Sequence, residues 1–242
     1  MAFRFLFFVF LGIGSSFGFA QTGDDNEGWT LGIFTTYGAA SVGEGEKSLQ
    51  AFPILQYDLG PWTFGGQAIA TYTWVNPSPK AEINGRFLGL RSTLGLGADF
   101  GQDVTAAGLP EVDLAPTALL KLTYDGFFYQ ASAEWASRLD SDGGSRFTAG
   151  LGTGYPVSDT LILTLGASAT YGNADYRAVY YGLEEAGLMA WDISALGIFT
   201  GHDQVTVLAG LTYEVLDDSV TAQPFVTEEN SLFLVLGFAY DL

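Results

Sequence analysis

The stretch "SLFLVLGFAYDL" (residues 231–242) alternates large apolar side chains with a smaller, mixed set. Successive side chains of an extended strand point to opposite faces. One face of this segment therefore carries a continuous apolar stripe, made of Leu232, Leu234, Leu236, Phe238, Tyr240 and Leu242. The segment is predicted to be a β-strand whose apolar face lies against a non-aqueous environment.

The same alternation recurs along the chain, for example in "LILTLGASATY" (161–171) and "VDLAPTALLKLTY" (112–124). No segment keeps the 3.6-residue period of an amphipathic helix over several turns, so helix is expected to be essentially absent. Eleven strands are predicted, near residues 28–37, 49–58, 62–74, 86–98, 112–124, 127–137, 146–155, 161–171, 189–199, 203–214 and 231–242.

The composition narrows the class of protein. Of the 242 residues, 48% are hydrophobic and only 15% are charged, against roughly 25% charged in soluble domains. The net charge of −18 excludes a nucleic-acid binder, which needs a basic surface for phosphates. The chain has no Cys, so disulfides and thiolate chemistry are excluded.

The second face of the strands indicates where water lies. It carries mostly Gly, Ala, Ser and Thr with isolated charges such as Arg91, Lys121 and Glu134, rather than the many Lys and Glu of a solvent-exposed sheet. Aromatic residues such as Trp62 and Trp74 stand at strand ends, as they do at the two interfaces of a membrane-spanning barrel. We therefore predict an all-β, single-chain antiparallel transmembrane β-barrel with a narrow, polar interior.

The connections refine the strand count. Short turns are predicted near 59–61, 125–126, 156–159 and 201–203, and the remaining connections are longer and acidic. Outer-membrane barrels have short periplasmic turns and long external loops, so an even number of strands must lie between two short turns. Only the interval 62–124 holds an odd number. A missing strand within 84–111 would give 12 strands, and the alternative is 10.

The Asp125–Gly126 dipeptide is typical of a two-residue hairpin turn. Such a turn pairs Tyr124 with Phe127 and Leu120 with Ala131, so that every outward residue faces another outward residue. A shift by one residue would exchange the two faces.

The N-terminal segment resembles a secretory signal peptide. Residues 1–20 contain one early cation, Arg4, then an apolar run from 5 to 13, then small residues that end at Ala20. The apolar run is shorter than the ~20 residues that a membrane-spanning helix needs. Residues 1–20 are therefore expected to be cleaved, which leaves 21–242 as the barrel.

Candidate catalytic and metal-binding residues are few. The one His, His202, lies in a predicted periplasmic turn, and we expect no catalytic residue, no cofactor and no metal site. Acidic pairs in the loops have the oxygen ligands that divalent cations prefer, but such pairs are more commonly just solvated. These pairs are Asp140/Asp142, Asp217/Asp218 and Glu228/Glu229.

Five charged residues are candidates for the barrel lumen: Arg91, Asp113, Lys121, Glu134 and Arg138. Charged side chains inside a barrel either line a conduction path or pair with one another in a closed lumen. The sequence leaves both alternatives open.

Several segments, taken in order, resemble the MipA/OmpV family of outer-membrane proteins, named for the MltA-interacting protein. The matching segments are "FPILQYDLGPWTFGG", "GLRSTLGLGADFGQD", "LPEVDLAPTALLKLTYDGFFYQASAEW", "NADYRAVYYGLEEA" and "SLFLVLGFAYDL". Within the last, Gly237, Tyr240 and Leu242 resemble the C-terminal assembly signal Gly-x-x-aromatic-x-aromatic, with Leu242 in place of the usual terminal Phe.

The resemblance implies a non-enzymatic barrel in the bacterial outer membrane, surrounded by lipid and lipopolysaccharide. It implies a scaffold for a murein-cleaving lytic transglycosylase and a murein-synthesising penicillin-binding protein, or a role in adhesion or envelope stress. The alternative function is a narrow, cation-preferring channel.

Overall fold

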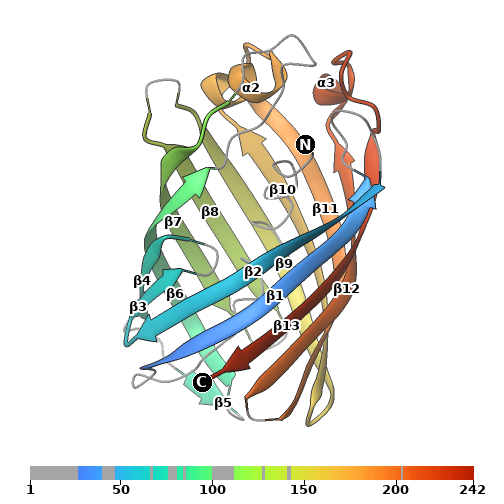
Figure 1. Cartoon of the computed structure of the whole chain (residues 1–242). Helices are drawn as coiled ribbons and strands as arrows, with labels where there is room; N and C mark the ends of the chain where they lie inside the picture. Colours follow the sequence, from blue (N-terminus) through green and yellow to red (C-terminus); the bar gives the residue numbers. More distant parts are fainter. Residues whose placement is uncertain are drawn as a thin grey trace.

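The computed structural model describes residues 27–39, 47–65, 68–75, 81–83, 86–99, 112–126, 129–140, 143–202 and 204–242. Its strands form one antiparallel sheet that closes on itself as a barrel (Figure 1). Residues 1–26, which include the expected signal peptide, lie outside the described residues.

Twelve strands form the barrel wall, which confirms the predicted fold and the larger of the two strand counts. The barrel closes where β1 pairs with β13 and where β4 pairs with β6; the short β5 pairs only with the start of β6. The strands are β1 (Glu27–Ala39), β2 (Lys47–Leu59), β3 (Trp62–Gly65), β4 (Ala70–Val75), β5 (Ala81–Ile83), β6 (Arg86–Asp99), β7 (Ala115–Asp125), β8 (Gln130–Arg138), β9 (Ser145–Ser158), β10 (Leu161–Gly172), β11 (Gly187–His202), β12 (Val205–Leu216) and β13 (Asn230–Asp241).

The strand predicted at 62–74 is wrong, because this segment is a hairpin of the two short strands β3 and β4. The pairing of Trp62 with Tyr72 shows the reversal. Gly65 has φ +82, a left-handed conformation that Gly adopts without strain. The additional strand therefore lies here; within the interval 84–111, the described residues 86–99 all belong to β6. Period-two alternation could not reveal the break, since both arms of the hairpin keep their rings on the same face.

The hairpin after β7 has a different register from the predicted one. Tyr124 pairs with Ala131 rather than with Phe127, and Leu120 pairs with Trp135. The amide of Gly126 donates to the carbonyl of Tyr129 at 2.8 Å, so the turn is longer than two residues. Because the shift along the ladder is even, outward residues still meet outward residues.

The large apolar side chains point away from the barrel, as predicted. Leu163 is 48% exposed in the isolated molecule, whereas the adjacent Thr164 is 3% exposed. Along β13 the residues alternate in the same way, with Leu232, Leu234 and Leu236 outward. The outer surface is thus an apolar band for contact with hydrocarbon.

The interior is more varied than the sequence pattern indicates. Buried polar residues such as Thr148, Ser168 and Ser194 line it. The strands β1, β11, β12 and β13 add an apolar cluster of Leu196, Leu208 and Val235, against which Phe34 and Ile198 pack. The lumen therefore combines polar side chains with one apolar cluster.

The two ends of the barrel differ. Both termini of the barrel sheet lie at one end, here called the turn end, where β2, β7, β9 and β11 also end (Figure 1). The opposite end, here called the loop end, carries two short helices, α2 (Ala174–Tyr181) and α3 (Asp218–Thr221). Among the described residues, helix is confined to these two short loops, as expected for a chain in which helix is essentially absent. None of the described helices is long and apolar enough to cross a membrane.

Replacing Leu165, an outward residue of β10, by Arg should destabilise the barrel by about 2–4 kcal/mol, the usual cost of a cation on the lipid face. Ser158→Arg at the turn end should change stability by less than about 0.5 kcal/mol, since its side chain remains in water. Urea unfolding in phospholipid vesicles measures both. Equal stability of the two variants would show that Leu165 does not face hydrocarbon.

Candidate functional site

The helix α2 begins and ends at residues suited to these positions. The side chain of Asn173 accepts a hydrogen bond from the amide of Tyr176 at 2.9 Å, which caps the first turn. Gly182 ends the helix with φ 66, the left-handed conformation that Gly adopts at helix C-termini. These two signals were present in the sequence, but a single eight-residue helix is too short to show a clear period.

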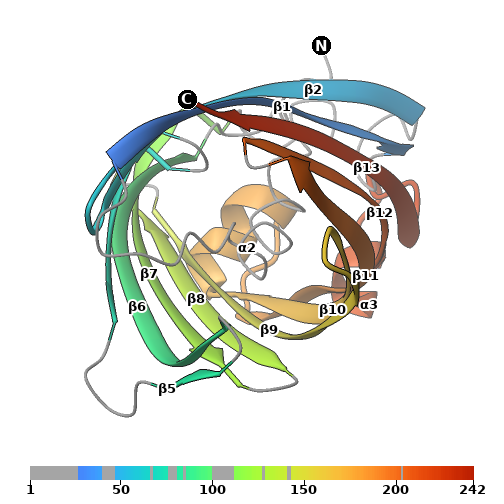
Figure 2. The same cartoon turned by 90° about the horizontal axis from the view of Figure 1, so that it is seen from below.

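Viewed along the barrel, α2 lies inside the ring of strands at the loop end (Figure 2). Tyr176 and Tyr180 stack with ring centroids 4.5 Å apart and are buried with Val112 and Met189. Gly144 gives the helix room, because a Cβ there would lie 2.5 Å from the amide nitrogen of Tyr176. This loop is folded inward over the mouth of the barrel.

Arg138 holds this arrangement together. Its guanidinium donates to the hydroxyl of Tyr180 at 3.0 Å, to the backbone carbonyl of Asp113 at 3.0 Å and to the carboxylate of Asp140 at 2.5 Å. Arg138 is buried, whereas Asp113 is exposed just before β7 begins. The two residues meet through a carbonyl, so Asp113 does not act here through its charge.

Asp140 is the half-buried acidic partner of Arg138. The hydrogen bond and the positive charge from Arg138 hold the pKa of Asp140 below its usual value. Asp142, the other member of the predicted acidic pair, lies outside the described residues.

Arg177 joins the two helical loops. It donates to the carbonyl of Glu185 at 2.7 Å and to the hydroxyl of Ser219 in α3 at 2.5 Å. Asp217 accepts from the backbone amide of Ser219 at 3.0 Å and caps α3. Asp217 and Ser219 therefore serve as a cap and a bridge between loops, and the sequence alone did not identify Arg177.

The remaining charged candidates lie on β6, β7 and β8. Arg91 forms a 2.8 Å salt bridge with Asp125. Lys121 and Glu134 are direct neighbours across the β7–β8 ladder, and Glu134 lies 3.8 Å from Arg146 on β9. Lys121, Glu134 and Arg146 thus form a row of alternating charge across three strands. Asp125 and Arg146 were missed, because only the register reveals which inward residues are neighbours.

The residues of the C-terminal assembly motif lie at or near the closing seam. A Cβ on Gly237 would approach a ring carbon of Phe34 to 3.1 Å. The hydroxyl of Tyr240 donates to Gln204 at 3.0 Å, and the amide of Leu242 donates to the carbonyl of Trp29 at 2.8 Å. These contacts fasten β13 to both of its neighbouring strands.

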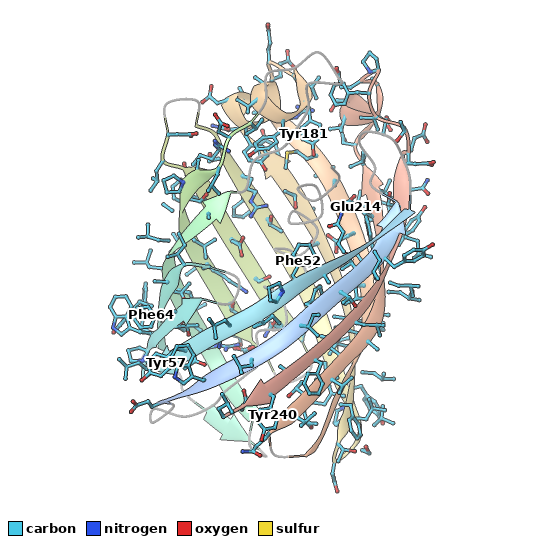
Figure 3. All side chains as sticks on the ribbon, in the orientation of Figure 1. Phe52, Tyr57, Phe64, Tyr181, Glu214 and Tyr240 are labelled. Carbon is cyan, nitrogen blue, oxygen red and sulfur yellow. The ribbon has the colours of Figure 1, made fainter. Side chains whose placement is uncertain are left out.

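Aromatic side chains gather near the turn end on β1 to β4. Trp29 and Tyr57 lie with ring centroids 4.9 Å apart, as do Trp62 and Tyr72. Figure 3 shows Tyr57 and Phe64 on the outside of the wall near this end, with Tyr240 also near it. Within the described ranges, no group of three or more His, Cys, Asp or Glu is placed to hold a metal ion, and His202 is the last residue of β11.

A closed antiparallel barrel with an apolar outer band, a partly charged lumen and short turns at one end is an outer-membrane β-barrel protein. The family model described as "MltA-interacting protein MipA" matches residues 31–242. The chain therefore belongs to the MipA family, and it resides in the outer membrane. By the topology rule for these proteins, the turn end faces the periplasm and the loop end faces outward.

One solved structure shows the same architecture. The NanC porin aligns with a TM-score of 0.52 at 11% identity, covering 88% of this chain and 100% of the porin. Two structures align less well, both with a TM-score of 0.44 at 9% identity: an OmpT loop-deletion mutant of Vibrio cholerae (91% of this chain, 100% of that one) and an anion-selective porin from Comamonas acidovorans (90% and 99%). At 11% identity, the NanC alignment establishes the fold alone. No curated protein matches the chain.

The lowered pKa of Asp140 predicts how α2 responds to acid. The ion pair with Arg138 should be fully formed above the ordinary Asp pKa of about 3.9 and lost as the pH falls through the lower folded value. A spin label at the exposed Ala178 of α2 should therefore stay immobile from neutral pH to about pH 4 and become mobile below it.

Asp140→Asn should make the label more mobile at neutral pH and remove this acid transition. Asp125→Asn, which removes the partner of Arg91 near the turn end, is the matched control and should leave the label unchanged. An acid transition that persists in Asp140→Asn would show that Arg138–Asp140 does not anchor α2.

Proposed function

We propose that this protein is a non-enzymatic scaffold of the outer membrane. Its periplasmic turn end would bind enzymes that cleave and synthesise murein, namely a lytic transglycosylase and a penicillin-binding protein. The name of the family, "MltA-interacting protein", supports the first partner. The apolar outer band would contact outer-membrane lipid, with lipopolysaccharide around the loop end.

The observation that carries this proposal is that charged side chains of the interior are engaged in holding α2 or in ion pairs. Arg138 and Arg177 tie α2 into the mouth, while Arg91 is neutralised by Asp125. Side chains that hold a loop across the lumen are unsuited to line an ion-conduction path. This arrangement favours a structural role over transport.

The turn end is the surface available to periplasmic partners. The connection between β9 and β10 exposes Ser158 and Asp159 there, whereas α2 lies at the opposite end. The segment with the most distinctive sequence, which contains α2, would therefore not contact murein enzymes. Its role would be to close the outer mouth.

A non-enzymatic role fits the placement of the one His. His202 ends β11 at the turn end. A base for hydrolysis of lipids or external substrates would have to lie at the outer rim. The proposal that the protein is not an enzyme rests on this placement and on the family assignment.

The second candidate function is a narrow, cation-preferring channel. The polar wall of β6–β9 favours it, because the row Lys121–Glu134–Arg146 would lie along a permeation path. The two candidates differ in whether ions pass when α2 is in place.

A photo-crosslinking amino acid at Asp159 should capture a murein enzyme in intact cell envelopes, because this turn faces the periplasm. The same amino acid at Ala178 in α2 is the matched control and should capture none. Mass spectrometry of the crosslinked bands identifies the partner. Capture of no cell-wall enzyme from Asp159 or from the other short turns would contradict the scaffold proposal.

In planar lipid bilayers the purified protein should be electrically silent, since α2 and the paired charges occupy the lumen. Reproducible single-channel steps whose ion selectivity changes in Lys121→Glu would favour the channel instead. Leu165→Ala, on the lipid face, is the control and should leave either result unchanged.

A further inference from the structure

Two carboxylates meet on the inner wall of the barrel. Asp192 on β11 and Glu214 on β12 are direct partners across the antiparallel ladder. Both occupy inward positions, because the adjacent Trp191 and Tyr213 are outward and exposed. Cβ atoms of directly opposite residues lie about 5 Å apart. We call Asp192 and Glu214 the lumen carboxylate pair.

Hydroxyl groups flank the pair. The carboxylate of Asp192 accepts a hydrogen bond from Ser168 on β10, and Ser231 on β13 is the cross-strand partner of Glu214. Asp192 is half-buried, and among the described residues no ion pair includes it. The described ion pairs are Arg91–Asp125, Arg138–Asp140 and Arg146–Glu134. Like charges directly opposite each other destabilise a sheet, so a cation beside Asp192 and Glu214 would be favourable.

A buried hydroxyl next to the pair also lacks a partner. Thr212 lies two residues before Glu214 on the same face of β12 and is 0% exposed. Its Oγ1 has no hydrogen-bond partner in the described part of the chain. A buried hydroxyl without a partner is costly. Thr212 therefore points to a ligand at this place independently of the two carboxylates.

The ladder places a fourth oxygen at the same position. Ser194 pairs with Thr212 one inward rung from Asp192 and Glu214. The two hydroxyl residues are buried, whereas the two carboxylates are half-buried. Neighbouring strands lie about 4.8 Å apart, so an ion held between the carboxylates would lie beside both hydroxyls.

These ligands favour a divalent cation, and Ca²⁺ in particular. The charge of the two carboxylates matches that of a divalent ion, and oxygen ligands suit hard cations. Mg²⁺ demands nearly ideal octahedral geometry, whereas Ca²⁺ accepts longer contacts and irregular arrangements. Side chains fixed on two adjacent strands fit the more adaptable ion.

The helix α2 shields this place from the outer mouth. Figure 3 shows Tyr181 at the loop end, above Glu214. Burial, and next the negative charge of Glu214, raise the pKa of Tyr181 above its ordinary value, so its hydroxyl stays neutral. An ion at the pair would therefore lie beneath α2, within the lumen.

We propose that Asp192 and Glu214, together with Thr212 and Ser194, form a Ca²⁺ site on the lumen wall. The ion would neutralise the lumen carboxylate pair and hold β11 and β12 together beneath α2. The site goes beyond the proposed scaffold function, and either proposal can fail without the other.

Isothermal titration calorimetry with CaCl₂ tests the site in the full-length mature protein, folded in detergent and freed of metal beforehand. One Ca²⁺ per barrel should bind with a Kd of about 0.1–1 mM, and Mg²⁺ about tenfold more weakly. Asp192→Asn combined with Glu214→Gln should abolish binding, because it removes both charged ligands. Thr212→Val, which keeps the shape of the side chain, should weaken binding about threefold or more.

The matched control removes two carboxylates elsewhere. Glu228 and Glu229 are adjacent and exposed in the connection before β13. Glu228→Gln combined with Glu229→Gln makes the same change in charge as the double variant of the lumen pair. It should leave the Kd for Ca²⁺ unchanged.

Urea unfolding in phospholipid vesicles separates ion binding from a purely structural role of Asp192. Without Ca²⁺, Asp192→Asn should be at least as stable as the unaltered protein, because it removes a like-charge repulsion. With Ca²⁺ at about ten times its Kd, the unaltered protein should unfold at a higher urea concentration, since the ion binds only the folded state. Asp192→Asn should show little of this shift.

Four results would overturn the proposal. Undiminished Ca²⁺ binding in the double variant of the lumen pair would place the ion elsewhere, and loss of binding in the Glu228/Glu229 control would assign it to the external loop. Equal affinity for Mg²⁺ would remove the assignment to Ca²⁺. Lower stability of Asp192→Asn both with and without Ca²⁺ would make Asp192 only a hydrogen-bond acceptor for Ser168.

Discussion

The need to pair every backbone N–H and C=O at membrane depth governs this structure. Sheet closure satisfies it almost everywhere, through the β1–β13 seam and through the pairing of β4 with β6. The amide of Leu242 continues the seam to the end of the chain by donating to Trp29. Because hydrocarbon surrounds the wall, the ladder of backbone hydrogen bonds within the wall has to be continuous.

Closure into a twelve-strand ring also creates an interior in which charged side chains need partners. Buried charges are costly unless they are paired, and the lumen pairs them across neighbouring strands, as in Arg91–Asp125 and the row around Glu134. At the loop end the same requirement is met by folding a loop inward. Arg138 there is satisfied by Tyr180 and Asp140, and this fixes α2 in the mouth.

The wall departs from uniformity where β3 and β4 are short. A full-height hairpin at this point would have covered the edge of β2 and left Pro53 in the middle of a paired ladder, where proline is not tolerated. The short hairpin and the proline are thus consistent with each other. Together they give the barrel one side that differs from the others.

The sequence by itself determined the fold class, the outward face and ten of the twelve wall strands, because alternation along a strand is a local property. Leu163 and Thr164, for example, can be assigned to the outward and inward faces without knowing which strands lie beside them. The sequence also placed Lys121, Glu134 and Arg138 on the inward face. It contained the capping residues Asn173 and Gly182, but these could be recognised as caps only once the structure showed the helix between them.

Only the tertiary structure decided which inward residues meet. The register of the β7–β8 hairpin set Lys121 beside Glu134, and an even shift in that register leaves the alternation pattern unchanged. The split of 62–74 into two strands, the inward fold of α2 and the contact between Arg177 and Ser219 likewise depend on packing between segments distant in sequence. Local periodicity carries no information about such contacts, because it repeats identically whatever strand lies alongside.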